Sequence, residues 1–246
     1  MIRVTLNGAS GRMGRAITRI AEETGKIVVA HKVDVTEGFE KIEEITPNDV
    51  DVVIDISSPE GFKKALMWAV RNRKPFISGA TGLQIADLIS LDTAAESIPV
   101  LHTSNLSKGV NILFEIMKKA AALTGDADIE IIETHHSKKK DAPSGTALEI
   151  GKIITSGQST RNLKSVEGRS GITGERASNE IGYHSIRCGD VPGEHTVIFA
   201  YDGERIEISH KALTRDIFAR GAIEAALFIA GKKPGRYSMK DVIGKG

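Results

Sequence analysis

Hydrophobic patterns typical of strands and of helices alternate along the first hundred residues. The strand-like stretches, with alternating or continuous apolar residues, are 2–7, 26–35, 49–57, 75–80 and 98–103. The helix-like stretches between them are an amphipathic segment that ends near Gly25, and residues 59–73 and 83–96. This alternation implies parallel strands joined by right-handed crossovers, and therefore a doubly wound sheet. The interval between Asp34 and Val50 is short for a crossover helix, so we expect only a helical stub there.

The pattern changes after about residue 107. The expected elements are helices over 107–125, 146–157 and 215–232, and strands over 128–136, 181–190, 194–203 and 204–212. Gly-Asp and Asp-Gly turns separate the last three strands, which is typical of an antiparallel meander. Residues 157–180 are polar and rich in glycine, and we expect a mobile loop. The final helix has an apolar face of small residues that suits packing on the first sheet.

These elements predict an α/β protein with two domains. Residues 1–106 and 216–246 are expected to form a Rossmann-like domain with a doubly wound parallel sheet, because the final helix returns to it. Residues 107–215 are expected to form an inserted α+β domain with a mainly antiparallel sheet.

Composition excludes several classes of partner. Of the 246 residues, 33 are Lys or Arg and 32 are Asp or Glu, so the net charge of +1 argues against a general nucleic-acid or membrane-surface binder. Cys188 is the single cysteine, which excludes an intramolecular disulfide and a multi-cysteine metal site. No apolar run approaches the roughly 18–20 residues of a membrane span. The first residues enter a strand without the features of a signal peptide, so we expect a cytoplasmic protein.

A glycine cluster lies between the first strand and the first helix. Gly8, Gly11 and Gly14 occur in "GASGRMG", where a turn can bring backbone N–H groups and the positive end of a helix onto a pyrophosphate. Asp34 ends the second strand, as suits a carboxylate that binds the adenosine ribose hydroxyls. A tight turn without a ligand is the alternative, because the spacing departs from G-x-G-x-x-G. Strand, turn, helix and acid together favour a dinucleotide site.

Two later loops follow strands at the same edge of the predicted sheet, where ligands of open α/β sheets bind. They are "SGATG" (78–82) and "TSNLS" (103–107), and each could instead be an ordinary loop. The full set of expected cofactor contacts is Gly8, Ala9, Ser10, Gly11, Arg12, Met13, Asp34, Gly79, Ala80, Thr81, Thr103, Ser104, Asn105 and Leu106.

The stretch 131–147, "IIETHHSKKKDAPSGTA", carries the second group of candidate residues. His135 and His136 are neighbours on a strand and face opposite sides, so we do not expect them to chelate a metal. The ordinary interpretation would be that one histidine packs in the core and the other lies on the surface. However, Ser144 can cap a helix whose first N–H groups, at Gly145 and Thr146, would bind an anion beside the lysines. A histidine that donates a proton next to a bound carboxylate, with a dinucleotide, predicts hydride transfer followed by protonation.

The chain resembles the dihydrodipicolinate reductases along almost its whole length. The motifs that carry the resemblance are "GASGRMG" (8–14), "PEG" (59–61), "NLSKGVN" (105–111), "EIIETHHSKKKDAPSGTAL" (130–148), "GRSGITGER" (168–176), "GDVPGEHTVIF" (189–199) and "GERIEISHKA" (203–212). The resemblance implies reduction, with NADH or NADPH, of a small cyclic dicarboxylate that contains an imine, with overall loss of water. It also implies that the second domain binds the substrate and joins a homotetramer through its sheet.

The resemblance assigns roles within the histidine block. His135 is implied as the catalytic proton donor and Lys139 as a second one. His136 is implied as a substrate ligand, and "SGT" at Ser144, Gly145 and Thr146 as the cradle of a substrate carboxylate. Lys138 and Lys140 match no functional position, and no metal is implied.

Three departures from the family pattern affect the cofactor site. Ala80 replaces a threonine, Leu106 replaces a phenylalanine, and the region after Asp34 is shorter than in many members. Val35 stands where many members have an arginine, so Asp34 predicts a modest preference for NADH, against which Lys32 and Arg12 act. The alternatives left open are another two-domain NAD(P)-dependent dehydrogenase, acting on a semialdehyde or sugar, and a non-enzymatic NAD-binding module.

Overall fold

The computed structural model of the chain describes residues 1–244. The chain divides into two compact units, Met1–Lys108 with Asp216–Gly246 (unit 1) and Gly109–Arg215 (unit 2). The boundary expected between residues 106 and 107 lies two residues before this division.

Unit 1 contains a six-stranded sheet in which every pairing is parallel. The strands are β1 (Ile2–Asn7), β2 (Ile27–Val33), β3 (Val52–Asp55), β4 (Phe76–Ser78), β5 (Pro99–His102) and β11 (Gly235–Tyr237), in the order β11-β5-β4-β3-β1-β2. The order reverses direction beside β1, as in a doubly wound fold. The predicted Rossmann-like class is therefore confirmed for this unit. β11 was not predicted, because three residues are too few to show a strand pattern.

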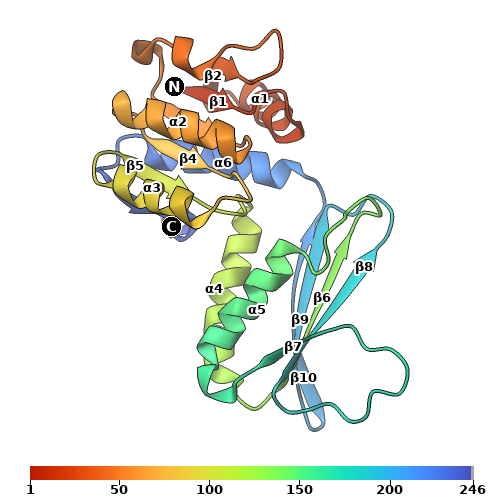
Figure 1. Ribbon diagram of the computed structural model, residues 1–246. Helices are drawn as coiled ribbons and strands as arrows, with labels where there is room; N and C mark the ends of the chain where they lie inside the picture. The colour runs from red at the N-terminus through yellow and green to blue at the C-terminus, as the bar shows by residue number, and fades with distance from the viewer. Residues whose placement is uncertain (245–246) are drawn as a thin grey trace. The chain divides into compact units, whose positions relative to one another are not determined.

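Helices cover both faces of this sheet (Figure 1). They are α1 (Arg12–Thr24), α2 (Pro59–Arg71), α3 (Ile85–Ala95), α6 (Asp216–Ile229) and the short α7 (Met239–Ile243). Ile17 of α1 and Ala222 of α6 belong to one core cluster, whereas Phe62 of α2 and Leu91 of α3 belong to another. Each face of the sheet thus has its own buried layer, which explains why the strands are apolar on both sides.

The expected stub replaces a crossover helix after β2. Two single turns of 3-10 helix, η1 (Ile42–Glu44) and η2 (Pro47–Asp49), lead into β3. Ile42 and Ile45 are buried in the core cluster that includes residues of α2 and α3. These two side chains therefore cover the part of the core that a crossover helix would otherwise cover.

Unit 2 contains a five-stranded mixed sheet. Its strands are β6 (Asp128–His135), β7 (Lys164–Glu167), β8 (Glu180–Arg187), β9 (Gly193–Tyr201) and β10 (Glu204–Ala212), in the order β10-β9-β6-β8-β7. β10-β9 and β9-β6 are antiparallel, whereas β6-β8 and β8-β7 are parallel. The expectation of a mainly antiparallel sheet was therefore wrong in its detail, although the α/β class with a second sheet is confirmed.

The predicted three-strand meander was wrong because β6 lies between β8 and β9. The Gly-Asp segment after β8 does not close a hairpin. Its backbone groups bond to the end of β6 instead: Cys188 N donates to His135 O at 2.9 Å, and His136 N donates to Val191 O at 2.8 Å. The segment therefore crosses over the end of one strand before β9 begins. Only β9 and β10 form the predicted hairpin.

Part of the region expected to be a mobile loop has regular structure. Residues 157–180 contain a 3-10 turn, η3 (Ser159–Arg161), and the edge strand β7. Arg169 and Arg176, from the same region, bind the Glu130 carboxylate of β6 at 3.0 Å each. The pairing of β7 with β8 and the ion pairs with Glu130 hold this stretch, and neither is visible in its polar composition.

Both helices of unit 2, α4 (Lys108–Leu123) and α5 (Gly145–Gly157), lie on the same face of its sheet (Figure 1). Met117 of α4 and Ile150 of α5 are buried with Ile129 and Ile131 of β6. Along β6 the buried positions alternate, and Glu133 and His135 continue this buried face to the end of the strand. The strand pattern thus places two polar side chains beside the start of α5.

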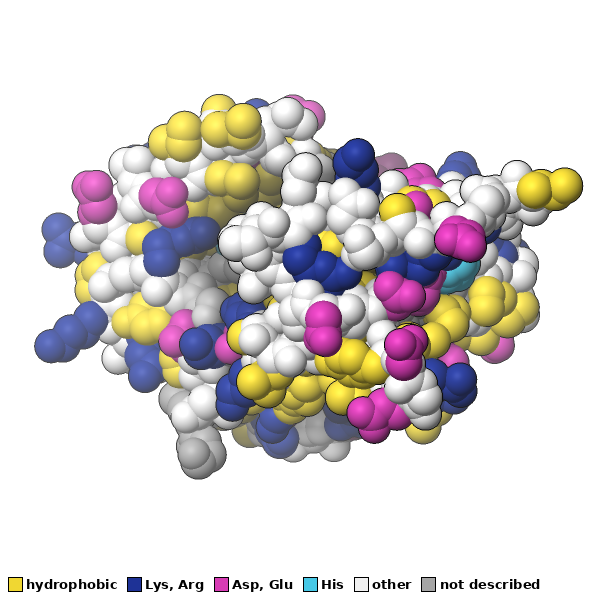
Figure 2. Space-filling model, turned by 90° about the horizontal axis from the view of Figure 1, so that it is seen from below, with side chains coloured by type: hydrophobic (Ala, Val, Ile, Leu, Met, Phe, Trp, Pro, Cys, Tyr) yellow, Lys and Arg dark blue, Asp and Glu magenta, His cyan; other side chains and the backbone are white. Residues whose placement is uncertain are grey.

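The surface agrees with the nearly neutral composition. On the face that Figure 2 shows, basic and acidic side chains are interspersed. Among residues 1–244, no helix has the length and apolar character needed to cross a membrane.

Candidate active site

The turn between β1 and α1 is shaped by two glycines. Gly8 has a φ of +90°, and a Cβ there would lie 2.9 Å from the carbonyl carbon of Ile56. A Cβ on Gly14 would lie 2.5 Å from the carbonyl oxygens of both Gly8 and Ala9. The α1 N-cap, Gly11, makes no side-chain capping bond, so the N–H groups at the start of α1 have no partner within the helix. The start of α1 therefore presents backbone donors and the positive end of a helix dipole.

The predicted acid, Asp34, lies against this turn. Its carboxylate accepts hydrogen bonds from Ser10 N at 3.0 Å and from the Thr36 hydroxyl at 2.9 Å. Burial raises the pKa of Asp34, but the hydrogen bonds from Ser10 and Thr36 outweigh it and lower the pKa to about 2. Asp34 is thus ionised at neutral pH. The structure brings together Ser10 and Asp34, two of the expected cofactor contacts.

The loops after β4 and β5 are joined to the same edge of the sheet by a buried carboxyl group. Asp55, at the end of β3, accepts hydrogen bonds from Asn7 at 2.8 Å, Ser57 at 2.5 Å and Ser78 at 3.0 Å. Burial raises the pKa of Asp55, and these hydrogen bonds oppose the rise. Thr103 N donates to Ser78 O at 3.1 Å, which connects the two loops. Asp55 was not singled out in the sequence, where it reads only as the end of an apolar strand.

Two of the residues that depart from the family pattern are buried. Ala80 and Leu106 are 3% and 5% exposed, so their side chains contribute to the core more than to an open surface. A Cβ on Gly79 would lie 2.9 Å from Leu106 Cδ1, which shows how closely the two loops pack. It would also lie 3.5 Å from Ile56, the residue that adjoins Gly8. The Gly8 turn and the loop at Gly79 are therefore neighbours.

In unit 2, His135 forms a hydrogen-bonded pair with Glu133. Nδ1 of His135 lies 2.5 Å from Oε2 of Glu133, which is buried. Burial lowers the pKa of His135, and the interaction with Glu133 only partly offsets this. A Cβ on Gly193 would lie 2.9 Å from Nε2 of His135, so the absence of a side chain there leaves space beside this atom.

Glu133 has further partners. Arg187 of β8 donates to both of its oxygens, at 2.9 and 2.7 Å, and Ser144 N donates at 3.2 Å. Burial raises the pKa of Glu133, but the hydrogen bonds from Arg187 and His135 outweigh it, so the pKa is lowered. One ionised carboxylate therefore holds His135 and the residue that caps α5.

Strand register places this cluster. Glu133 of β6 pairs with His195 of β9, and His135 pairs with Arg187 of β8. The His195 ring meets the His135 ring edge to face, with centroids 5.3 Å apart, and its Nε2 lies 3.1 Å from Ser144 Oγ. Burial lowers the pKa of His195 to about 3, so this imidazole is neutral.

The predicted cradle begins α5. Ser144 is the N-cap, and its hydroxyl accepts from Ala147 N at 3.3 Å. Gly145 and Thr146 are the first two helical residues, as expected. Their position at the positive end of the helix suits a carboxylate.

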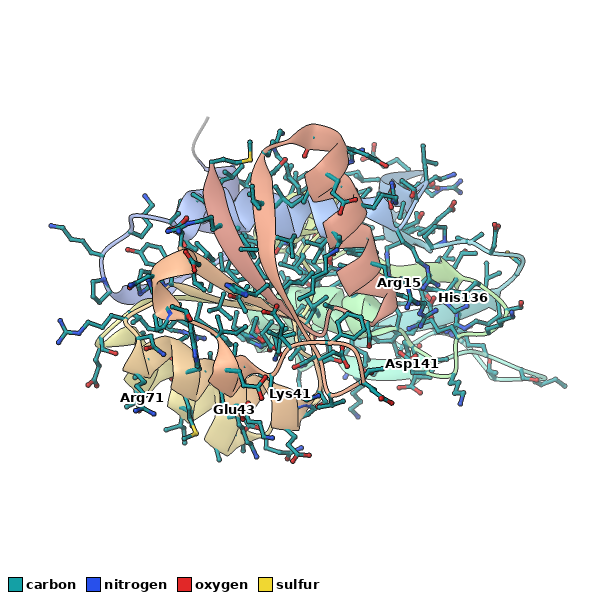
Figure 3. The ribbon with its side chains drawn as sticks, turned by 90° about the horizontal axis from the view of Figure 1, so that it is seen from above. Arg15, Lys41, Glu43, Arg71, His136 and Asp141 are labelled. Atoms are coloured by element: carbon teal, nitrogen blue, oxygen red, sulfur yellow. The ribbon has the colours of Figure 1, made fainter. Side chains whose placement is uncertain are left out.

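The lysine run is only partly exposed. Lys139 is paired with Asp141 at 2.8 Å, whereas Lys138 and Lys140 are exposed. Asp141 also presents its backbone carbonyl to Arg187 at 2.8 Å, so Lys139 is connected through Asp141 and Arg187 to Glu133. His136 and Asp141, on either side of the run, are labelled in Figure 3.

Four residues beside His135 were not among the predicted site residues: Glu133, Arg187, Gly193 and His195. Glu133 could have been found, because its position two residues before His135 puts both on one strand face. The other three come from β8 and β9, and the register that aligns them is not visible locally. Within residues 1–244, no group of three or more His, Cys, Asp or Glu side chains could hold a metal ion.

Comparison with known proteins covers both units. The family model "Dihydrodipicolinate reductase, N-terminus" matches residues 2–106, and "Dihydrodipicolinate reductase, C-terminus" matches residues 109–243. Two relatives are both named 4-hydroxy-tetrahydrodipicolinate reductase. That of Akkermansia muciniphila is 45% identical over 247 residues, covering 99% of this chain and 98% of its own. That of Syntrophotalea carbinolica is 41% identical over 265 residues, covering 99% of each chain.

Solved structures share the fold. Dipicolinate-bound dihydrodipicolinate reductase from Paenisporosarcina sp. TG-14 has a TM-score of 0.77 and 21% identity, with 99% of each chain covered. A probable dehydrogenase from Thermotoga maritima has a TM-score of 0.61 and 13% identity, with 98% of this chain and 92% of the other covered. At such identities the likeness concerns the fold alone. Because the two family models and both relatives extend over the glycine turn of unit 1 and the histidine block of unit 2, the chain belongs to the dihydrodipicolinate reductase family.

Proposed function

We propose that the chain reduces 4-hydroxy-tetrahydrodipicolinate, a cyclic imine dicarboxylate, to tetrahydrodipicolinate, with the hydroxyl group leaving as water, in the biosynthesis of diaminopimelate and lysine. Membership of the family makes it an NAD(P)H-dependent oxidoreductase. The strongest support from the structure is Glu133, whose carboxylate binds both His135 and the backbone of Ser144. A proton donor and the start of an anion-binding helix are thereby held together.

Unit 2 supplies the groups for the substrate. The N–H groups of Gly145 and Thr146 and the Thr146 hydroxyl would bind one carboxylate, next to the cap at Ser144, and His136 would bind the other end of the substrate. His135 would give a proton, because an imidazole can change its charge near neutral pH. Lys139, half-buried and paired with Asp141, is the second donor that we propose.

Unit 1 supplies the groups for the cofactor, and they fit a dinucleotide. The first turn of α1, which follows Gly11, has N–H groups without a side-chain cap for the pyrophosphate, and ionised Asp34 has oxygens for ribose hydroxyls. We propose that Ala9, Ser10, Arg12 and Met13 contact the cofactor in or beside this turn. The loops 79–81 and 103–106 would flank the nicotinamide, and the bound cofactor would supply the hydride.

The function is tested by following NADH absorbance with purified protein and candidate substrates. We expect oxidation that depends on dihydrodipicolinate or its hydrate, and none with aspartate semialdehyde. Oxidation with a semialdehyde or a sugar would favour another two-domain dehydrogenase. NADH binding without oxidation by any substrate would favour a non-enzymatic module.

A modest preference for NADH is expected in steady-state kinetics with both cofactors. Ionised Asp34 repels a 2′-phosphate, and Val35 provides no cation to receive one. Lys41, whose Nζ donates to Asp34 O at 2.9 Å, adds a positive charge beside Lys32 and Arg12 and keeps the preference small. If kcat/KM with NADPH were higher by about tenfold or more, the nearby cations would outweigh Asp34, since tenfold corresponds to about 1.4 kcal/mol.

Replacement of Thr146 by valine should chiefly raise KM for the dicarboxylate, by about tenfold or more, with a small change in kcat. The hydroxyl would bind the carboxylate in ground and transition states alike, and a hydrogen bond to a charged group contributes about 1.5–3 kcal/mol. Thr155→Val, near the other end of α5, is the matched control for loss of a helical hydroxyl. Equal KM values in the two variants would exclude Thr146 from the cradle.

We also infer a homotetramer that forms through the sheet of unit 2. Both helices of this unit lie on one face of the sheet, and partly buried or exposed side chains such as Ile132, Ile198 and Ile206 lie along its strands. The cytoplasmic location stays a prediction from composition.

A further inference from the structure

The Glu133 carboxylate is surrounded by hydrogen-bond donors and a histidine nitrogen, which come from Arg187, Ser144, Ser185 and His135. Oε2 accepts from Arg187 Nη1 at 2.9 Å and lies 2.5 Å from His135 Nδ1. Oε1 accepts from Arg187 Nη2 at 2.7 Å and from Ser144 N at 3.2 Å. The Glu133 side chain is 1% exposed, so protein groups alone determine its state.

This arrangement determines where the His135 proton lies. A bidentate arginine and a backbone N–H keep Glu133 ionised, and an ionised carboxylate can only accept hydrogen bonds. Nδ1 of His135 must therefore carry hydrogen. In the neutral imidazole Nε2 is then the bare nitrogen, and in the protonated ring it is the nitrogen with a hydrogen that Glu133 does not hold.

The surroundings of Nε2 complete the picture. A Cβ on Gly193 would come within 2.9 Å of Nε2, so a residue with a side chain would occupy the space at this nitrogen. His195 meets the ring edge to face and is itself held by Ser144. The ring is thus held on its Nδ1 side, and there is space beside its Nε2 atom.

We propose that Glu133, clamped by Arg187, is the positioning residue that keeps a proton on Nδ1 of His135 and so makes Nε2 the atom that gives a proton to the substrate. This inference rests on the proposed function of His135 as the proton donor. The same carboxylate holds Ser144 N, so Glu133 also ties the donor to the helix that would bind the substrate carboxylate. Loss of a carboxylate that orients a metal-ligating histidine typically costs about 10–100-fold in metal affinity or activity, and we expect an effect of that order for His135.

The charges around His135 determine the expected pH dependence. Glu133 faces it from β6, Arg187 from β8, neutral His195 from β9 and Lys139 from the following loop. Glu133 raises the pKa of His135, whereas Lys139 and Arg187 lower it. Loss of the Glu133 charge must therefore lower this pKa further. The limb of activity that needs a protonated imidazole should then be lost at a lower pH.

Glu133→Gln is the variant that tests the positioning role. We expect kcat to fall about 10–100-fold, the pH limb to move to lower pH, and KM for the dicarboxylate and Kd for NADH to change much less. The matched control is Glu130→Gln. Glu130 also lies on β6 and also binds a histidine and arginines, namely His184 at 2.6 Å, Arg169 and Arg176, but its position in the strand alternation puts it on the other sheet face. A folded Glu133→Gln protein with the kcat and pH profile of the control would overturn the proposal.

A second measurement does not depend on a variant that folds. The nitrogen chemical shifts of the imidazoles in the wild-type protein report which ring nitrogen carries hydrogen, and the spectrum of His135→Gln identifies the His135 signals among those of seven histidines. Above the pKa of His135 we expect hydrogen on Nδ1 and a bare Nε2. Hydrogen on Nε2 would overturn the proposal even if the enzyme were fully active. Conversely, the Nδ1 form in a protein that reduces no dicarboxylate would place the failure in the proposed function.

Discussion

His135→Gln is expected to lower kcat by about 10²–10⁴-fold while NADH binding stays intact, because a general acid acts mainly in the transition state. Glutamine keeps a polar side chain next to Glu133 but cannot change its charge near neutral pH. The glycine turn lies in unit 1 and His135 in unit 2, so the cofactor Kd should not follow kcat. The measurement is steady-state kinetics on protein whose folding and NADH affinity have been checked.

The control for His135→Gln is His210→Gln, since His210 lies on β10 and has no proposed role. Lys139→Ala should also lower kcat. This substitution also removes the ion pair between Lys139 and Asp141. Near-normal kcat for folded His135→Gln from about pH 6 to 9 would refute the donor assignment. His136, or a water held by Lys139, would then be the next candidate.

The second large effect is expected at the glycine turn, where Gly14→Ala should raise the Kd for NADH by at least about tenfold. A methyl group at residue 14 would lie 2.5 Å from two carbonyl oxygens, so the turn has to shift. Overpacking of this kind costs about 1–3 kcal/mol, and about 1.4 kcal/mol corresponds to tenfold in affinity. Some loss of thermal stability should accompany it.

Gly125→Ala is the matched control for this substitution, because a Cβ at Gly125 meets nothing within 4 Å. NADH titration and thermal unfolding of the two variants separate a local effect from a general one. If Gly14→Ala bound NADH as tightly as Gly125→Ala, the turn would not hold the cofactor.

Local patterns were sufficient for most of unit 1. Each strand-helix pair there packs on its neighbours in sequence, so the alternation of apolar stretches predicts both element and place. The strand β11 is an exception. It has three residues, and its place at the edge of the sheet depends on pairing with β5, which lies far away in the sequence. The stub after β2 was predicted, because chain length alone excludes a crossover helix.

The fold of unit 2 was harder to predict because several of its strands pair with partners that are not their neighbours in the sequence. The Gly-Asp segment at 189–190 has the composition of a hairpin turn, yet the backbone of residues 188–191 bonds to residues 135–137, at and just after the end of β6. Composition cannot show that another strand already occupies the place between β8 and β9. The same non-local register brings Arg187 and His195 to His135, so the partners of the proposed donor were not predicted even though the donor was.

The resemblance and the residues contributed differently to the function. The family assignment is confirmed over both units, and with it the class of oxidoreductase. The individual roles of His135, Lys139 and the Ser144–Thr146 cradle stay predictions. The structure adds a physical reason for the first of them, since an ionised, fully surrounded carboxylate holds one nitrogen of the ring.

The most direct measurement of the central claim traces the hydride. The protein is given cyclic imine dicarboxylate and NADH that is fully deuterated at C4 of the nicotinamide, and the product is analysed by mass spectrometry. We predict that the wild-type protein forms tetrahydrodipicolinate that carries one deuterium on carbon. The His135→Gln variant should form much less of this product. Product without deuterium, or NADH oxidation without a reduced dicarboxylate, would contradict the account.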